Sequence, residues 1–299
     1  MIRASFRAFA EGLIDYAGIF PPAALSLDQA FRNYMDYWRT PDAWMLGRFV
    51  CPARRLSEIP EPVRVSALAR GGKTPEEFAA GWHEDIIDIG RFHDRFSSHG
   101  LVMAIEARLP DGASPRRGNG YQVFLEAASP ESIPDTIAKI GALMGESAAT
   151  SGRAHGSLGF KLRCGGESAA DFPSAEQIAA AIDACRRAGV SIKATAGLHH
   201  PVRAFRPEVG TTMHGFLNVF GAALLAHEHT LDPEAILKVV QEEDPAAFRF
   251  TDETFGWRDL KIGAERIRAL RRGAVTSFGS CSFDEPREDL RALGLLNGV

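Results

Sequence analysis

The sequence predicts a closed eight-stranded parallel β/α barrel, and three observations lead to this fold class. The chain has 299 residues, of which 45% are hydrophobic, enough to bury a large core. Short apolar runs alternate with longer amphipathic stretches, the pattern of repeated β/α units. The runs number about eight, which is the count that closes a TIM-type barrel. An open doubly wound sheet is the alternative, but no GxGxxG follows the first run.

The expected strands and helices follow one another in order along the chain. Stretches between the apolar runs place apolar residues at helical spacing, and several open on Ser, Thr or Asp and close on Gly. The helices are expected at 26–38, 74–96, 174–189, 259–273 and 285–294. The strands are expected at 13–20, 45–51, 63–69, 101–109, 121–127, 158–165, 191–197 and 274–282.

The connection between the seventh and eighth strands is much longer than the others. Roughly 75 residues separate them, far more than a usual connection. We expect an extended helical insertion at about 200–260, which would cap the barrel mouth or hold a subunit contact. No linker divides the sequence, so we expect a single domain over 1–299, and we expect a homo-oligomer.

Charge and cysteine content narrow the expected partners. Lys and Arg total 34 against 38 for Asp and Glu, so no basic field attracts nucleic acid or an anionic membrane. No run reaches about 18 apolar residues and the first residues lack a cleavable leader pattern, which predicts a cytoplasmic protein. The cysteines at 51, 164, 185 and 281 form no CxxC pair and are expected as reduced thiols. The expected partner is a small-molecule substrate.

Four consecutive strands carry charges on one face only. Successive strand residues point to opposite faces, and helices cover the outside of a parallel barrel, so the charged face belongs inside. Buried ion pairs seldom stabilise a fold more than apolar residues do, so a functional site is a better interpretation than a purely structural network. The inward set, late in each strand, is Glu106, Arg108, Glu126, Lys161, Arg163 and Lys193, with Thr195 and Asp15 beside it.

Lys193 is the candidate nucleophile of this set. An amine becomes nucleophilic where apolar neighbours or nearby cations destabilise its ammonium form. It would form a Schiff base with a carbonyl substrate, while Glu106 or Glu126 moves protons. Lys161 and Arg163 would bind a substrate carboxylate or phosphate and depress the pKa of the amine.

The segment K-A-T-A-G at 193–197 resembles the K-x-S/T-x-G strand of deoxyribose-phosphate-type class I aldolases. In that family the lysine is the Schiff-base residue of an eight-stranded β/α barrel. The resemblance therefore implies a lyase or aldolase with Lys193 in that role. It departs from the family in one respect: there a second lysine lies on the following strand, whereas here Lys161 lies on the preceding one.

Two glycine-bearing loops at strand ends are further candidates for substrate binding. Gly165 and Gly166 follow the sixth strand, and Gly279 and Ser280 lie at the end of the eighth. Their backbone N–H groups would bind a phosphate or carboxylate. The rigid loop at 19–22 is expected to form a wall of the pocket.

Histidines near the same rim suggest a second class of enzyme. His199 and His200 directly follow the seventh strand and are candidates for proton transfer or substrate hydrogen bonding. Together with His214 and the glutamates they could instead bind a divalent metal ion, as in a metal-dependent hydrolase or lyase. Adjacent strand residues point apart, and none of these three histidines belongs to an HxH or HExxH spacing, so we expect no cofactor. A non-catalytic anion-binding barrel is the third alternative.

Overall fold

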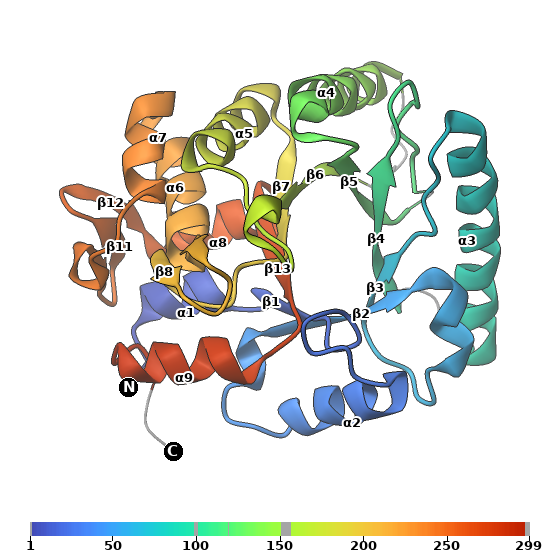
Figure 1. The fold of residues 1–299 in the computed structure, drawn as a ribbon, viewed down its shortest axis with the longest axis horizontal. Helices are drawn as coiled ribbons and strands as arrows, with labels where there is room; N and C mark the ends of the chain where they lie inside the picture. The colour runs from blue at the N-terminus through green and yellow to red at the C-terminus, as the bar shows by residue number, and fades with distance from the viewer. Residues whose placement is uncertain (1, 99–100, 119, 151–156, 297–299) are drawn as a thin grey trace.

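The computed structural model describes residues 2–98, 101–118, 120–150 and 157–296, and its centre is a closed barrel of eight parallel strands (Figure 1). The order around the barrel is β1-β13-β7-β6-β5-β4-β3-β2. Each strand falls within or nearly within one of the eight apolar runs, which confirms the predicted fold class. The strands are β1 (Ile14–Tyr16), β2 (Leu46–Pro52), β3 (Val65–Leu68), β4 (Val102–Leu109), β5 (Gln122–Ala127), β6 (Leu158–Arg163), β7 (Ser191–Thr195) and β13 (Val275–Ser280).

Helices surround this barrel (Figure 1). Three of them begin at expected capping residues. In α5 the Ser174 hydroxyl accepts the N–H of Gln177, and the helix ends at Gly189 in the left-handed conformation with φ 64°. Ser26 and Thr74 cap two other helices in the same way. The outer layer comprises α1 (Ala4–Ala10), α2 (Leu27–Tyr37), α3 (Pro75–Arg95), α4 (Ile133–Thr150), α5 (Ala175–Ala188), α8 (Ala264–Gly273) and α9 (Asp284–Ala292).

The insertion between β7 and β13 is only partly helical. It contains α6 (Phe216–His229) and α7 (Pro233–Val240), but also two small antiparallel sheets. Their strands have three or four residues each, too short for periodicity to reveal. One of these strands, at 260–263, occupies residues expected to begin the helix at 259–273. That helix, α8, starts only after Gly263. The sheets are formed by β8 (Ala204–Arg206) with β9 (Thr211–Met213), and by β10 (Phe248–Phe250), β11 (Thr254–Trp257) and β12 (Leu260–Gly263).

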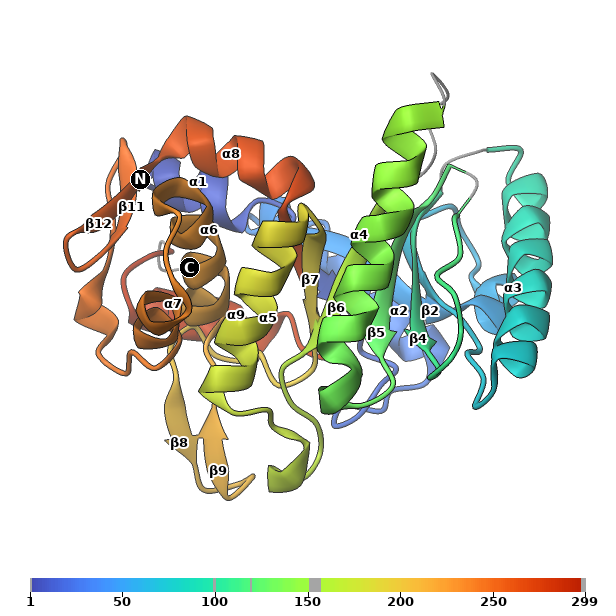
Figure 2. The ribbon, with the colours of Figure 1, turned by 90° about the horizontal axis from the view of Figure 1, so that it is seen from above.

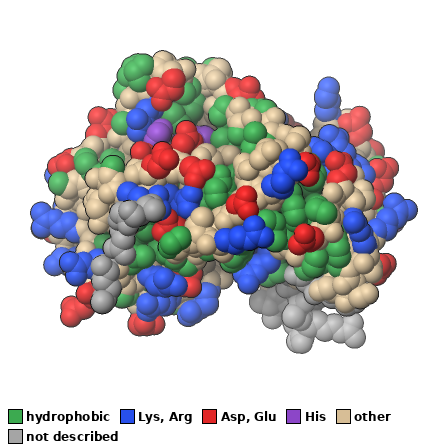
Figure 3. Space-filling model, turned by 90° about the horizontal axis from the view of Figure 1, so that it is seen from below, with side chains coloured by type: hydrophobic (Ala, Val, Ile, Leu, Met, Phe, Trp, Pro, Cys, Tyr) green, Lys and Arg blue, Asp and Glu red, His purple; other side chains and the backbone are tan. Residues whose placement is uncertain are grey.

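The two ends of the barrel are covered differently. Figure 2 shows α1 and α8 at the end where the strands begin, which we call the base. The β8–β9 hairpin projects at the opposite end, where the strands finish, which we call the mouth. Basic and acidic side chains are interspersed on the face drawn in Figure 3. Within the described ranges, helices that are both long and apolar enough to cross a membrane are not found.

Candidate active site

A row of alternating charges crosses the barrel lumen. The Lys193 ammonium contacts the Asp15 carboxylate and lies 3.3 Å from Oε1 of Glu106. The other oxygen of Glu106 lies 3.1 Å from Nζ of Lys161, which is also 3.4 Å from Oε2 of Glu126. Glu106 is therefore shared between two ammonium groups. The structure brings these five predicted residues into one connected network.

Two buried serines complete the network, and the sequence analysis missed both. Ser66 donates a hydrogen bond of 2.6 Å to Oε1 of Glu106. Ser277 donates one of 2.8 Å to Oδ2 of Asp15, and its hydroxyl accepts from Lys193 at 3.2 Å. Both serines have the inward parity of their strands, so a search for polar as well as charged inward residues would have found them.

The two lysines of the row lie at different depths. Lys161 on β6 and Lys193 on β7 are register partners, and both point into the lumen. A pocket opens at the mouth of the barrel, which we call the mouth pocket. Lys193 is 0% exposed and does not line it, whereas Lys161 is 6% exposed and does. The structure therefore places Lys161, and not Lys193, within reach of a molecule in this pocket.

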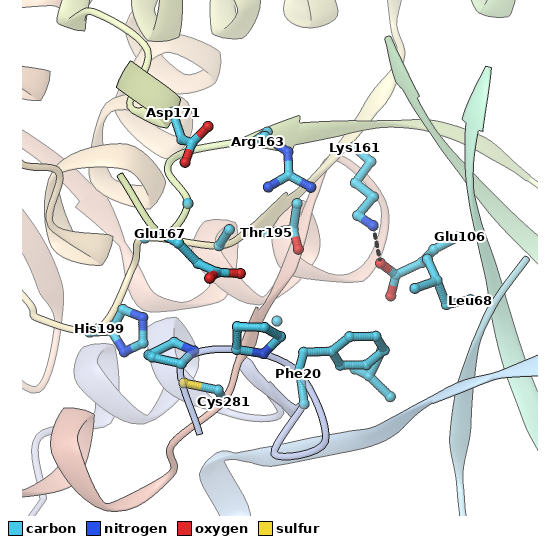
Figure 4. A pocket seen from close by; sticks show the side chains of 18 residues that line it. Phe20, Leu68, Glu106, Lys161, Arg163, Glu167, Asp171, Thr195, His199 and Cys281 are labelled. Atoms are coloured by element: carbon cyan, nitrogen blue, oxygen red, sulfur yellow. Dashed lines mark ion pairs between the residues drawn. The ribbon is translucent and has the colours of Figure 1, made fainter. Parts of the chain in front are cut away.

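The mouth pocket has a volume of about 470 Å³ and is shown in Figure 4. Glu106, Lys161 and Arg163 extend toward its interior, and Phe20 lies across from them. The expected wall is present, because residues 20–22 line the pocket. Two acids from the loop after β6, Glu167 and Asp171, also line it. The sequence analysis missed them because they follow the strand, where strand parity no longer applies.

The network fixes the charge states of its members. Burial alone would raise the pKa of Glu106, but Lys193 and Lys161 outweigh this effect and lower that pKa to about 2. Burial alone would lower the pKa of Lys161, but Glu106 and Glu126 outweigh it and raise that pKa above its ordinary value. Burial alone would also raise the pKa of Glu126, but Lys161 and Arg163 outweigh this effect and lower that pKa. At neutral pH the resting site therefore holds ammonium and carboxylate groups.

Arg163 presents an unfilled donor to the mouth pocket. Its Nε donates to Glu126 at 2.8 Å and its Nη1 to the carbonyl of Gly165 at 3.2 Å. Its Nη2 has no hydrogen-bond partner among the described residues, and the guanidinium faces the pocket (Figure 4). Arg108 does not line the mouth pocket: it is exposed, donates to the carbonyl of Ala128 and lines a neighbouring pocket that Glu126, Lys161 and Arg163 also line.

The loops after β6 and β7 touch through their backbones. Gly197 has φ +69°, and a Cβ there would lie 2.8 Å from the carbonyl oxygen of Cys164. A Cβ on Gly165 would lie 2.9 Å from Cα of Gly197. Both distances are shorter than real Cβ contacts, so this backbone contact requires glycine at each position. Gly197 lines the mouth pocket, whereas Gly165 does not.

The other predicted rim residues divide between the pocket and its surroundings. Thr195, Gly166 and Gly279 line the mouth pocket. Ser280 does not: its side chain is buried, and its hydroxyl accepts the N–H of Ser282 at 3.3 Å. The anion-binding role expected for Ser280 therefore has no geometric support.

The three histidines do not share a site. Nδ1 of His199 lies 3.0 Å from Glu285, and Nδ1 of His200 lies 2.6 Å from Asp289. Nε2 of His214 lies 2.7 Å from a backbone carbonyl in the loop before α5. Of the three, His199 alone lines the mouth pocket. Within the described part of the chain no three His, Cys, Asp or Glu side chains are placed to hold a metal ion, so the geometry gives the alternative metal-ligand set no support.

Comparison with known proteins gives one distant structural likeness to report. No family model matches the sequence, and no curated protein matches it. Among solved structures, deoxyribose phosphate aldolase from Aeropyrum pernix, described as having a unique tetrameric structure, matches with 10% sequence identity and a TM-score of 0.37. The match covers 96% of this chain and 93% of that chain. The barrel topology itself rests on the strand order described above.

Proposed function

We propose that this barrel is a lyase of the aldolase type that acts on a small anionic carbonyl compound through a Schiff base on Lys161. The observation that carries the proposal is the position of Nζ of Lys161 at the mouth pocket, 3.1 Å from Glu106 and 3.4 Å from Glu126. Among the described residues, Lys161 is the one lysine that lines this pocket. It takes the nucleophilic role that the sequence pattern suggested for Lys193.

Lys193 has a supporting role in this proposal. Glu106 offers Oε1 to Lys193 and Oε2 to Lys161, so neither ammonium has this carboxylate to itself. When Lys161 gives up its proton, Glu106 keeps Lys193 as a charged partner. The second lysine therefore reduces the electrostatic cost of a neutral amine at Lys161.

The reaction starts with a proton transfer inside the site. A substrate that fills the pocket displaces water, and a drier site favours a neutral amine and acid over an ion pair. Glu126 or Glu106 takes the proton from Lys161, whose nitrogen then bonds to the carbonyl carbon. The carboxylic acid returns its proton to the carbonyl oxygen, and the carboxylate then carries a second proton from the nitrogen to the same oxygen. The oxygen leaves as water, and a protonated imine forms.

Carbon–carbon bond cleavage follows from this imine. The imine accepts the electron pair of the breaking bond, while a carboxylate takes the proton from the hydroxyl group on the departing carbon. That fragment leaves as an aldehyde. Protonation of the remaining enamine and addition of water release the second product and restore Lys161.

Arg163 supplies the recognition of the anionic group. Its free Nη2 faces the pocket, and guanidinium groups bind carboxylate and phosphate through charge-assisted hydrogen bonds. Gly166 and Gly279 line the same pocket and allow a close backbone approach. A pocket of about 470 Å³ suits a small metabolite.

Reductive trapping tests the proposal. The protein is incubated separately with acetaldehyde, pyruvate and dihydroxyacetone phosphate in the presence of borohydride, and peptide mass spectrometry locates the adduct. We expect an adduct on Lys161 that is lost in Lys161→Met and kept in Lys238→Met, a variant of an exposed lysine on α7. An adduct on Lys193 would overturn the assignment of the nucleophile. No adduct with any substrate that is turned over would remove the covalent mechanism, and binding without turnover would favour an anion-binding barrel.

A further inference from the structure

A second pocket opens at the base of the barrel. It has a volume of about 240 Å³ and lies where the strands begin. Its lining and that of the mouth pocket have no residue in common. We call it the base pocket; its charged lining residues are Glu11, Asp15, Arg48, Arg64, Arg271 and Arg272.

Arg48 on β2 has an unfilled donor in this pocket. Its Nη2 donates to the side-chain oxygen of Gln122 at 3.2 Å. Its Nη1 is buried without a hydrogen-bond partner and lies 3.8 Å from Asp15, beyond hydrogen-bond distance. A buried guanidinium nitrogen without a partner has lost its hydrogen bonds to water and has no protein hydrogen bond to replace them, which destabilises the fold.

Arg271, at the end of α8, is in a similar position. Its Nη1 donates to the carbonyl of Val275 at 2.9 Å and its Nη2 to the carbonyl of Glu11 at 3.0 Å. Its Nε is buried without a partner. Burial lowers the pKa of Arg271 to about 9, because Asp15 and Glu11 only partly compensate for lost solvation. Neutral carbonyls satisfy two of its donors but leave its charge without an adjacent counterion.

The base pocket therefore has an excess of positive charge. Four arginines line it against two carboxylates, and one of these, Asp15, already contacts the Lys193 ammonium. Arg64 is exposed, and its guanidinium lies over the ring of Trp38 at 5.7 Å. This aromatic contact is uncharged, so it leaves the positive charge of Arg64 without a counterion. What is missing from this arrangement is an acceptor with negative charge.

We propose that the base pocket binds a phosphate group, either inorganic phosphate or a small phosphate monoester. Guanidinium groups match phosphate oxygens in geometry as well as charge, and four arginines line this pocket. One buried nitrogen of Arg48 and one of Arg271 have no hydrogen-bond partner in the structure. The volume of about 240 Å³ admits the phosphate with only a small organic group attached. The ligand would lie beside Asp15 and on the far side of the charged row from Lys161.

Calorimetric titration with inorganic phosphate at constant ionic strength tests this site. All measurements use the Arg163→Gln background, which removes the arginine of the mouth pocket. We expect phosphate binding to persist there and to weaken about tenfold when Arg64→Gln or Arg48→Gln is added, the loss for one charge-assisted hydrogen bond. Arg32→Gln, a change of an exposed arginine on α2, is the matched control and should leave the affinity unchanged.

The outcomes separate this site from the proposed reaction. Loss of all phosphate binding in Arg163→Gln alone would overturn the base site, as would equal affinities in the Arg64→Gln and Arg32→Gln variants. Arg64 is exposed, so its replacement leaves the core intact, and unfolding temperature verifies this. A parallel titration with glycerol 3-phosphate distinguishes a monoester from inorganic phosphate as the tighter ligand. Borohydride trapping on Lys161 reports on the mouth pocket and can fail or succeed independently.

Discussion

Lys161 and Lys193 occupy equivalent positions on neighbouring strands and yet meet different surroundings. Both are register partners facing the lumen, and both pair with Glu106. Lys193 also contacts Asp15 and Ser277 and is sealed from solvent. Lys161 reaches the mouth pocket. The comparison teaches that strand parity selects the face of a side chain, while position along the barrel axis decides whether it can meet a ligand.

The largest effect should come from Lys161→Met. If Lys161 is the amine that attacks the substrate, its loss should reduce turnover at least about 1000-fold, because no other described lysine lines the pocket. The measurement is kcat/KM with whichever substrate gives the borohydride adduct. Residual activity within about tenfold of the wild type would show that Lys161 is not the attacking amine.

Lys193→Met should act mainly on stability. Removing one partner of a buried ion pair leaves Asp15 without its cation, and we expect the free energy of unfolding to fall by about 3–5 kcal/mol. Urea denaturation measures this loss. The double variant Lys193→Met with Asp15→Asn should recover part of it, because it no longer buries an unpaired carboxylate. A loss below about 1 kcal/mol would show that Lys193 is not locked in the network.

Acid should weaken the network through Glu106, which links the two lysines. Its pKa is lowered from 4.5 to about 2 in the folded protein, so the folded state favours the carboxylate. The resulting stabilisation, on the order of 3 kcal/mol, is present above pH 4.5 and is lost as the pH falls toward about 2. Urea midpoints measured from pH 6 to pH 3 should fall more steeply for the wild type than for Glu106→Gln. Parallel curves for the two proteins would contradict the assigned pairing.

The smallest effect should come from Ser277→Ala. The hydroxyl contacts Asp15 and Lys193 but does not line the mouth pocket. We expect a loss of about 1–2 kcal/mol in unfolding free energy and no change in adduct formation on Lys161. Ser280→Ala on the same strand is the control, since its hydroxyl accepts a single long bond of 3.3 Å. A change in trapping rate with Ser277→Ala would contradict this expectation and show that the Ser277 hydroxyl affects the reactivity of Lys161.

The barrel was predictable from the sequence because each strand leaves a local signal. A run such as 158–165 combines strand length with apolar residues on the outward face, and β6 lies within it. The short strands of the insertion leave no such signal, because three residues such as those of β8 complete barely one alternation. Their pairing depends on contacts that only the folded chain brings together.

The site was predictable in its composition and less so in its arrangement. Parity identified Glu106, Glu126 and both lysines as inward residues, and the structure joins them. It also grouped Arg108 with them, but this side chain, two residues farther along β4, donates to a backbone carbonyl and lines a neighbouring pocket and not the mouth pocket. The depth of a side chain in the lumen depends on the tilt and stagger of the strands, and these cannot be read from the sequence of any one strand.

The backbone contact between the loops after β6 and β7 has a consequence for changing this protein's specificity. Any side chain at Gly197 would collide with the carbonyl of Cys164, and any at Gly165 would meet Cα of Gly197. Replacing either glycine would therefore require the end of a strand to move. A change in which molecules the pocket admits, whether by evolution or by directed libraries, would have to arise from replaceable side chains that line it, such as Val50, Leu68 and Thr195.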